Sequence, residues 1–314
     1  MRLKRGAAVM AALLMAGGAH AQDRDAPFSF AESGESFTTL AAAVRAVGRG
    51  RGTILIAPGT YRQCAVQQDG EIAYKAIEAG TAIFDGATCE GKAALVLRGR
   101  GARVDGLVFQ NMRVPDGNGA GIRLEQGYLD VVGSIFRNSE EGILTADDPA
   151  SEVRIDRSTF SRLGRCDRDL ACAHSIYIGG YGKLTVTRSR FERGTGGHYL
   201  KTRSAAVEIV DNSFDDSAGQ LTNYMIDLST GAGGTISGNE MVQGRDKDNY
   251  SAFITVAPEG REHSSAGLSI AGNSASFVPG LSRQSTFVAK WTDDAVHIGA
   301  NRLATGIKQS DRRE

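Results

Sequence analysis

Along most of the chain, a β-branched residue is followed five positions later by a bulky apolar residue. The pattern occupies residues 104–109, 131–136, 155–160, 186–191, 209–214 and 236–241, with weaker copies at 270–275 and 298–303. Successive copies begin about 23 to 34 residues apart, which is typical of solenoid repeats. Each copy is rich in Val and Ile and is bounded by Gly, Asn, Asp or Ser, so it predicts strands and turns.

A second apolar pattern alternates with the first. It occupies residues 122–124, 143–145, 176–178, 200–202, 226–228, 254–256 and 288–290. Two strands per repeat in a fixed order predict an all-β parallel β-helix, in which stacked coils join their apolar faces into one core.

One polar column runs through the first pattern. Its members are Ser134, Ser158, Ser189, Asn212, Asn239, Asn273 and Asn301. Because Asn tolerates the left-handed conformation, we expect this column to occupy a turn. We also expect its stacked amides to hydrogen-bond from coil to coil.

The ends of the chain differ from the repeats. Residues 1–21 have the form of a secretory signal, because basic residues precede the apolar stretch 7–16 and Ala-His-Ala closes it. We expect an N-terminal extension at 22–36, one β-helix domain at 37–305 opening with a capping helix at 37–47, and a disordered tail at 306–314. No other segment is apolar for long enough to span a membrane, so we expect a periplasmic or secreted protein.

The four cysteines form an even set, which permits disulfides in an exported chain. Three pairings are open. We favour Cys64 with Cys89, which are about one repeat apart, and Cys166 with Cys172, which would close the loop before His174. The spacing does not match a zinc site.

A short Ala-rich helix, then Gly-Thr-Ile-Leu-Ile-Ala-Pro-Gly-Thr-Tyr at 52–61, then β coils, is an order similar to the pectin-lyase-like superfamily. The resemblance covers about residues 37–305 and implies a right-handed parallel β-helix. The superfamily includes lyases, hydrolases, esterases, epimerases and non-enzymatic proteins, so its fold does not fix a reaction. The Asp-rich motifs of its polygalacturonase-like hydrolases and the Arg-x-Pro-x-x-Arg pattern of one pectate lyase group are absent. Lys201 and Arg203 resemble the Lys base and Arg of its alginate- and chondroitin-cleaving members.

The second pattern also predicts which side chains share an outer face. If the first residue of each copy points inward, the next points outward. That outward column is Arg123, Leu144, Tyr177, Lys201, Asp227, Thr255 and Ala289. Glu125 and Arg203 lie in a parallel column, Tyr199 lies on the near side, and His174 and His198 lie at the leading edge.

These residues predict a site for an anionic polysaccharide, and we expect cleavage by β-elimination. Arg203 would bind the uronate carboxylate, Lys201 would act as base, and His198 or Tyr177 would protonate the leaving oxygen. We expect His174, Tyr199, Asp227, Arg123 and Glu125 to contact the substrate. Four more cations, opposed only by Glu192, would add positive charge: Lys183, Arg188, Arg190 and Arg193.

Two other functions stay open at this point. A glycoside hydrolase would need two carboxylates, such as Asp227 with Glu125 or Asp148. A non-catalytic envelope protein would bind the polysaccharide without cutting it. We expect no nucleic-acid partner, because 36 basic residues balance 36 acidic ones, and we expect a monomer.

No cofactor is expected, although one acidic segment raises the question of calcium. It contains Glu140, Glu141, Asp147 and Asp148. Since no calcium-binding repeat is present, we expect a solvated acidic loop.

Overall fold

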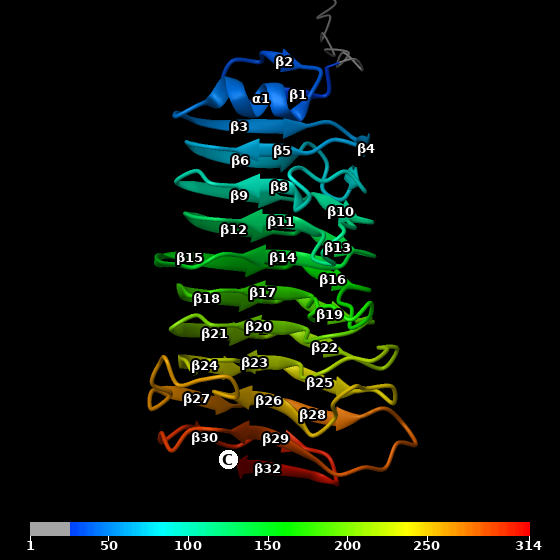
Figure 1. Cartoon of the computed structure of the whole chain (residues 1–314), viewed down its shortest axis with the longest axis vertical. Coiled ribbons are helices and arrows are strands. Elements are labelled where there is room, and N and C mark those ends of the chain that lie inside the picture. The colour runs from blue at the N-terminus through cyan, green and yellow to red at the C-terminus, as the bar shows by residue number, and fades with distance from the viewer. Residues whose placement is uncertain (1–25) are drawn as a thin grey trace, which may run out of the picture.

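The computed structural model describes residues 26–314, which form a stack of rungs bounded by three parallel sheets (Figure 1). Each rung adds one strand to each sheet, and the chain passes through sheets A, B and C in that order. The predicted all-β parallel β-helix is therefore confirmed.

Sheet A contains β2 (Ser36–Phe37), β1 (Phe28–Phe30), β3 (Arg51–Ile56), β6 (Glu71–Ala76), β9 (Gly101–Asp105), β12 (Tyr128–Val132), β15 (Asp148–Asp156), β18 (Tyr181–Thr187), β21 (Ala206–Val210), β24 (Gly233–Ser237), β27 (Leu268–Ala271) and β30 (His297–Ile298). Sheet B contains β4 (Gly59–Tyr61), β7 (Ala82–Asp85), β10 (Val108–Gln110), β13 (Ile135–Arg137), β16 (Thr159–Ser161), β19 (Arg190–Glu192), β22 (Ser213–Asp215), β25 (Glu240–Gln243), β28 (Ser274–Phe277) and β31 (Arg302–Leu303). Sheet C contains β5 (Ala65–Gln67), β8 (Ala93–Leu97), β11 (Ala120–Leu124), β14 (Glu141–Thr145), β17 (Ile176–Ile178), β20 (Leu200–Thr202), β23 (Ile226–Leu228), β26 (Ala252–Val256), β29 (Ser285–Lys290) and β32 (Ile307–Arg312).

A cap closes the N-terminal end of the stack (Figure 1). The predicted helix is present as α1 (Leu40–Val47), where the Thr39 side chain accepts a hydrogen bond from the Ala42 N–H at 3.2 Å. Its apolar face buries Leu40, Ala43 and Val44. Strands β1 and β2 pair antiparallel beside β3, so the described part of the predicted extension belongs to this cap.

The first sequence pattern spans the tight turn from sheet A to sheet B. From β9 to β28 each of these turns has two residues, and the first has a positive φ. The positive-φ residues are Gly106, Gly133, Arg157, Arg188, Asp211, Gly238 and Gly272. The Ser and Asn column occupies these turns, as predicted, from Ser134 to Asn273, and the left-handed conformation belongs to the residue before each member.

The Ser and Asn column also forms a buried ladder. The Asn212 amide donates to Asn239 Oδ1 at 3.0 Å, Asn239 to Asn273 at 2.9 Å, and Asn273 to Asn301 at 3.0 Å. The same oxygens accept backbone N–H groups of the preceding rung. The expected coil-to-coil hydrogen bonds are confirmed, and they satisfy backbone groups at a corner that has no strand pairing.

Sheet B lines the core with a stack of aromatic rings. The rings of Phe109, Phe136, Phe160, Phe191 and Phe214 follow one another with centroids 4.8 to 5.1 Å apart. All five side chains are buried. The stack repeats at the spacing of neighbouring strands, so one residue type fits the same position on five rungs.

The C-terminal segment differs from the expected disordered tail. Residues 307–312 form β32, which pairs in parallel with β29 as the last strand of sheet C. Without β32, the outer edge of β29 would expose unpaired backbone N–H and C=O groups. Backbone pairing with this edge does not depend on side-chain type, so even a polar segment can add a strand there.

Both favoured disulfides are present, Cys64–Cys89 and Cys166–Cys172. They fit an oxidising compartment outside the cytoplasm. The predicted secretory signal lies outside the described residues. Within residues 26–314, the helix is too short to cross a membrane.

The Asn ladder yields a stability prediction. Asn239→Ala would leave the Asn212 backbone N–H and one of the two Asn212 side-chain amide hydrogens without an acceptor in a buried position, while the other amide hydrogen still donates to Val186 O. Each such group typically costs about 1–3 kcal/mol, so we expect the free energy of unfolding to fall by about 2–5 kcal/mol in denaturant titrations. The control is the turn variant Asn118→Ala, because the half-buried Asn118 side chain donates only one long hydrogen bond, to Asp116 O at 3.4 Å, and we expect a change in stability of less than about 0.5 kcal/mol. An equal change in the free energy of unfolding for the two variants would contradict the stabilising role assigned to the ladder.

Candidate functional site

The predicted outward column of sheet C exists in register. Tyr177 lies beside Lys201, and Lys201 lies beside Asp227, on the successive strands β17, β20 and β23. From the N-terminal to the C-terminal rung the column is Arg123, Leu144, Tyr177, Lys201, Asp227 and Thr255. We call the outer face of sheet C from β11 to β26 the wall.

A bend just before each strand brings a second column onto the wall. A Cβ atom on Gly121 would lie 2.7 Å from the Phe136 ring, so this position faces the core like the residue after it. Two consecutive inward positions break the strand alternation and turn the residue before them outward. That second column is Glu141, His174, His198 and Tyr224.

Tyr199 does not join the wall. It occupies one of the inward positions at the bend and is 1% exposed. Its hydroxyl donates to Asp216 Oδ1 at 2.6 Å and accepts the Gly194 N–H at 3.1 Å. The expectation that Tyr199 contacts substrate is therefore wrong, because strict alternation was assumed across a bend.

The second column is a stack of rings along the axis of the helix. The His174 and His198 rings stack with centroids 4.9 Å apart, and His198 stacks on Tyr224 at 5.4 Å. The Tyr177 ring meets His174 edge-on at 5.6 Å, which joins the two columns. The register predicted for the two histidines is present.

Both histidines are electrically neutral near pH 7. Burial lowers the pKa of His174 well below the ordinary value, and its Nδ1 accepts the His198 backbone N–H at 2.9 Å. Burial also lowers the pKa of His198, although Asp227, whose carboxylate lies 3.6 Å from Nε2, opposes this. The His198 Nδ1 is buried without a partner, so Nε2 is the nitrogen directed toward Asp227.

Two cations of the wall share one carboxylate from a distant segment. Lys201 Nζ donates to Glu259 Oε1, and Arg203 Nη2 donates to Glu259 Oε2 at 2.6 Å. The Tyr177 ring lies beneath both cations, with its centroid 5.3 Å from Lys201 Nζ and 5.9 Å from Arg203 Cζ. Burial raises the pKa of Tyr177, so its hydroxyl keeps its proton at neutral pH.

Asp227 provides a second, buried negative charge. Its carboxylate accepts the hydroxyls of Ser229 at 2.8 Å and Thr255 at 2.7 Å, and lies 3.7 Å from Lys201 Nζ. Only 1% of Asp227 is exposed. Asp227 is therefore held as a fixed charge behind Lys201, and a ligand on the wall meets Lys201 first.

Glu259 was not anticipated from the sequence. It lies between β26 and β27, outside both repeated patterns, and is 58 residues from Lys201. The sequence offers no signal for this contact, because the connection between β26 and β27 does not belong to a repeated pattern and so cannot be aligned with the other rungs.

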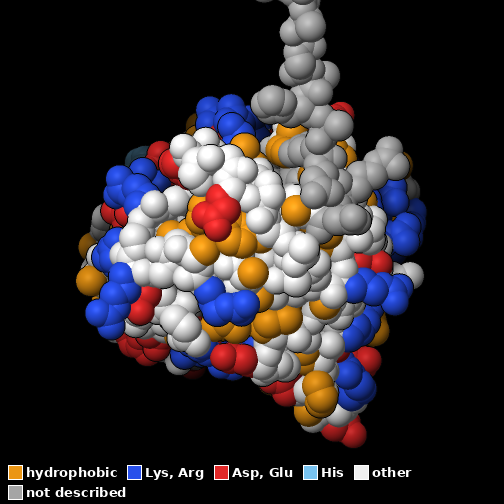
Figure 2. All heavy atoms as spheres, turned by 90° about the horizontal axis from the view of Figure 1, so that it is seen from above, with side chains coloured by type: hydrophobic (Ala, Val, Ile, Leu, Met, Phe, Trp, Pro, Cys, Tyr) orange, Lys and Arg blue, Asp and Glu red, His pale blue; other side chains and the backbone are white. Residues whose placement is uncertain are grey.

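The predicted concentration of positive charge on the wall is wrong. Lys183 belongs to sheet A, where it pairs with Glu208 at 2.8 Å, and Arg190 belongs to sheet B, where it pairs with Glu192. Arg188 lies in the turn between these sheets and pairs with Asp156 at 2.7 Å. Both signs of charge also surround the N-terminal end of the molecule (Figure 2).

Arg123 and Glu125 lie farther along the wall. Arg123 is separated from Tyr177 by the rung that carries Leu144. Glu125 pairs with Lys92 at 2.7 Å and with Arg98, so its charge is already compensated. The structure does not bring either residue into the His–Lys–Arg cluster.

The acidic segment considered for calcium does not converge on one point. Glu140 accepts two backbone N–H groups and pairs with Arg168, while Asp147 and Asp148 accept the Gly180 and Gly127 N–H groups. Among residues 26–314, no group of three or more His, Cys, Asp or Glu side chains is placed to hold a metal. The expected solvated loop is also wrong for Glu140 and Glu141, which are each 1% exposed.

Glu141 has an unusual environment at the head of the second column. Burial raises its pKa well above the ordinary value, even though its Oε1 accepts the His174 N–H at 3.2 Å. Its Oε2 is buried without a hydrogen bond, as is Arg123 Nε. A protonated Glu141 therefore best fits this site.

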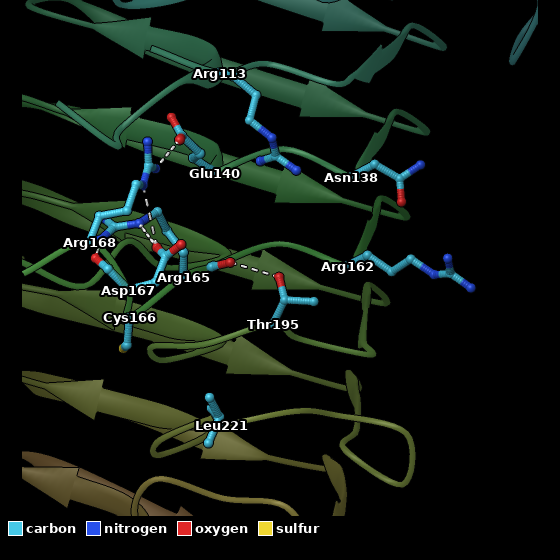
Figure 3. Close-up of a pocket in the computed structure, with 11 residues that line it drawn as sticks. Arg113, Asn138, Glu140, Arg162, Arg165, Cys166, Asp167, Arg168, Thr195 and Leu221 are labelled. Atoms are coloured by element: carbon cyan, nitrogen blue, oxygen red, sulfur yellow. Dashed lines mark hydrogen bonds and ion pairs between the residues drawn. The ribbon is translucent and has the colours of Figure 1, made fainter. Parts of the chain in front are cut away.

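A separate hollow of about 470 Å³ lies along the connections from sheet B to sheet C (Figure 3). It is lined by Arg113, Asn138, Glu140, Arg162, Gly164, Arg165, Cys166, Asp167, Arg168, Thr195 and Leu221. Arg165 and Arg168 are bound to Asp167 and Glu140 respectively. Since the hollow shares no residue with the wall, and two of its cations are already paired, we place the candidate chemistry on the wall.

A family model described as right handed beta helix region matches residues 93–278. Pectin methylesterase from Aspergillus niger, in deglycosylated form, is 12% identical with a TM-score of 0.50, covering 79% of this chain and 85% of that one. The ORF18 protein of Geobacillus virus E2 is 13% identical with a TM-score of 0.50, covering 88% of this chain and 57% of that one. These structural similarities show the fold, and no curated protein matches the chain.

Glu141 yields a pH prediction. Its raised pKa gives the fold a stabilisation that is present below the ordinary value of 4.5 and is lost as pH rises. Glu141→Gln removes this titration, so its stability relative to the parent should increase from pH 4.5 to pH 7. We expect a gain of about 1–3 kcal/mol at pH 7 in denaturant titrations. Glu152→Gln is the control, because the Glu152 side chain is 45% exposed, and it should not gain stability in this way. A Glu141→Gln variant that is less stable at pH 7 than at pH 4.5, relative to the parent, would contradict the assignment.

Proposed function

The chain belongs to the right-handed β-helix family, and on this basis we propose that it is an exported enzyme that cleaves a uronate-containing polysaccharide by β-elimination on the wall. One observation carries the proposal: two cations of neighbouring columns hold a carboxylate beside a neutral histidine. A uronate lyase needs this combination, because it must neutralise the substrate carboxylate before a base removes the adjacent proton.

Arg203 and Lys201 together form the carboxylate clamp. The guanidinium remains protonated and presents parallel donors, and the ammonium adds a second charge from the neighbouring column. Their ability to bind a carboxylate is supported by Glu259, which both contact. Neutralising the substrate carboxylate lowers the energy of the dianionic intermediate.

The geometry favours His198 over Lys201 as the base. Lys201 Nζ is engaged by Glu259 and Asp227, whereas His198 is neutral. In the tautomer that carries its hydrogen on Nδ1, His198 Nε2 would accept the proton on the carbon next to the carboxylate, and Asp227 at 3.6 Å would stabilise the resulting imidazolium. The electron pair of the C–H bond is first held in the dianionic intermediate and then forms the double bond as the bond to the leaving oxygen breaks.

Tyr177 would complete the reaction as the acid. Its hydroxyl keeps its proton at neutral pH and its ring lies against both clamp residues. Transfer of that proton to the leaving oxygen balances the step, and the proton on His198 later returns to Tyr177 through solvent. A hydrolase is less well supported, because Glu125 is paired with Lys92 and Arg98, and Asp148 accepts backbone N–H groups in sheet A.

To test the reaction, the protein is incubated with a panel of polyuronates. Unsaturated ends are followed by ultraviolet absorbance, and reducing ends are followed by a colour assay. We expect both to rise together on at least one polymer. New reducing ends without unsaturation would support a hydrolase, and binding without either would support a non-catalytic role.

Substitution of Lys201 distinguishes a role in binding the substrate carboxylate from a role as the base. If Lys201 belongs to the clamp, Lys201→Arg keeps the charge and should retain activity within about tenfold, while Lys201→Ala should lose about a hundredfold. Lys183→Ala, on sheet A, is the matched control and should behave like the parent. Loss of all activity in Lys201→Arg, with a folded protein, would return the role of base to Lys201.

Substitution of His198 tests the base. His198→Gln should lower kcat by about 10² to 10⁴-fold with a smaller change in KM. In the parent, kcat/KM should fall as pH drops below the ordinary histidine value of 6.5, because a protonated His198 accepts no proton. An unchanged kcat in His198→Gln would exclude this assignment.

A further inference from the structure

The carboxylate of Glu259 occupies the clamp in the described structure. One oxygen contacts Lys201, the other contacts Arg203, and the Tyr177 ring lies beneath both cations. This is the contact set that a uronate carboxylate would need there. A polysaccharide carboxylate and Glu259 cannot occupy the clamp together.

The backbone around Glu259 is firmly attached to the neighbouring rungs. The Glu259 N–H donates to Ser229 O at 2.9 Å, and the His263 N–H donates to Thr230 O at 3.1 Å. His263 Nε2 also lies 3.1 Å from Arg203 O. The side chain of Glu259, in contrast, is 38% exposed. Rotation of this side chain alone would therefore free the clamp without moving the loop.

The charges around the clamp favour replacement of the Glu259 carboxylate only by another anion. Lys201 and Arg203 are compensated by Glu259 and by the buried Asp227. If Glu259 left without replacement, two partly buried cations would lose hydrogen bonds and charge compensation, which is costly. A ligand carboxylate restores both, whereas a neutral sugar or an esterified uronate does not.

We propose that Lys201, Arg203 and Tyr177 form a carboxylate subsite for which Glu259 is an internal placeholder, displaced by a free uronate of the substrate. This inference rests on the proposed function for the identity of the ligand. The exchange makes the site selective for unesterified uronates, because only they can replace what Glu259 provides. It also weakens apparent affinity, since the ligand must compete with a tethered carboxylate.

The test compares Glu259→Gln and Glu259→Ala with the parent in a His198→Gln background, which suppresses turnover. Calorimetry would measure binding of oligogalacturonate, of its methyl ester and of a neutral dextran oligosaccharide. We expect each Glu259 variant to bind oligogalacturonate about tenfold or more tightly than the parent, with no gain for the ester or the dextran. Glu262→Gln is the matched control, because Glu262 is an exposed glutamate of the same loop. It should bind within about twofold of the parent.

Failure of this inference is distinguishable from failure of the proposed reaction. If unsaturated products form but neither Glu259 variant binds more tightly, the placeholder is excluded while the lyase stands. If Glu259 variants with intact His198 lose cleavage without any change in affinity, Glu259 takes part in the chemistry and the placeholder is again excluded. If the variants bind more tightly but no polyuronate is cleaved, the subsite stands and the lyase fails. Tighter binding of the neutral dextran would show that Glu259 merely blocks access, which overturns the carboxylate subsite.

Discussion

The parallel hydrogen-bond ladder of sheet C is the constraint on which the wall depends. Its register places Tyr177, Lys201 and Asp227 on adjacent strands although they are far apart in sequence. Neighbouring strands lie about 4.8 Å apart, so side chains of one column touch by construction. A shift of one residue on any rung would send its outward side chain into the core. The buried residues on either side of Lys201, Leu200 and Thr202, therefore position its side chain as firmly as any direct contact.

The sequence sufficed where the repeat is regular. Ile176, Leu200 and Ile226 reveal the inward positions, and the outward column follows from strand alternation. It did not suffice for Tyr199, because the bend before each strand puts two neighbouring residues inward and only the packing of the core reveals this. Glu259 was beyond reach for another reason: no repeat pattern aligns the connections that leave sheet C.

Charge shows a further limit of linear proximity. Lys183, Arg188 and Arg190 are close in sequence, yet one rung of a β-helix distributes them over sheet A, a turn and sheet B. Each then finds an acidic partner on a neighbouring rung or on its own strand. On the wall itself the positive charges of Lys201 and Arg203 are also matched, so the polyanion binding that we propose would depend on exchange of charged partners and not on an excess of positive charge.

The turn from sheet A to sheet B has the same length from β9 to β28, whereas the connections from sheet B to sheet C differ, as residues 162–175 and 193–199 illustrate. The fixed corner, with its left-handed residue and its amide or hydroxyl ladder, keeps the pitch of the whole coil independent of what is inserted elsewhere. The constant corner between sheets A and B therefore fixes the shape of the β-helix, and the variable connections between sheets B and C can change without altering that shape. Segments inserted between sheets B and C would change what borders the wall while the two side-chain columns of the wall kept their alignment.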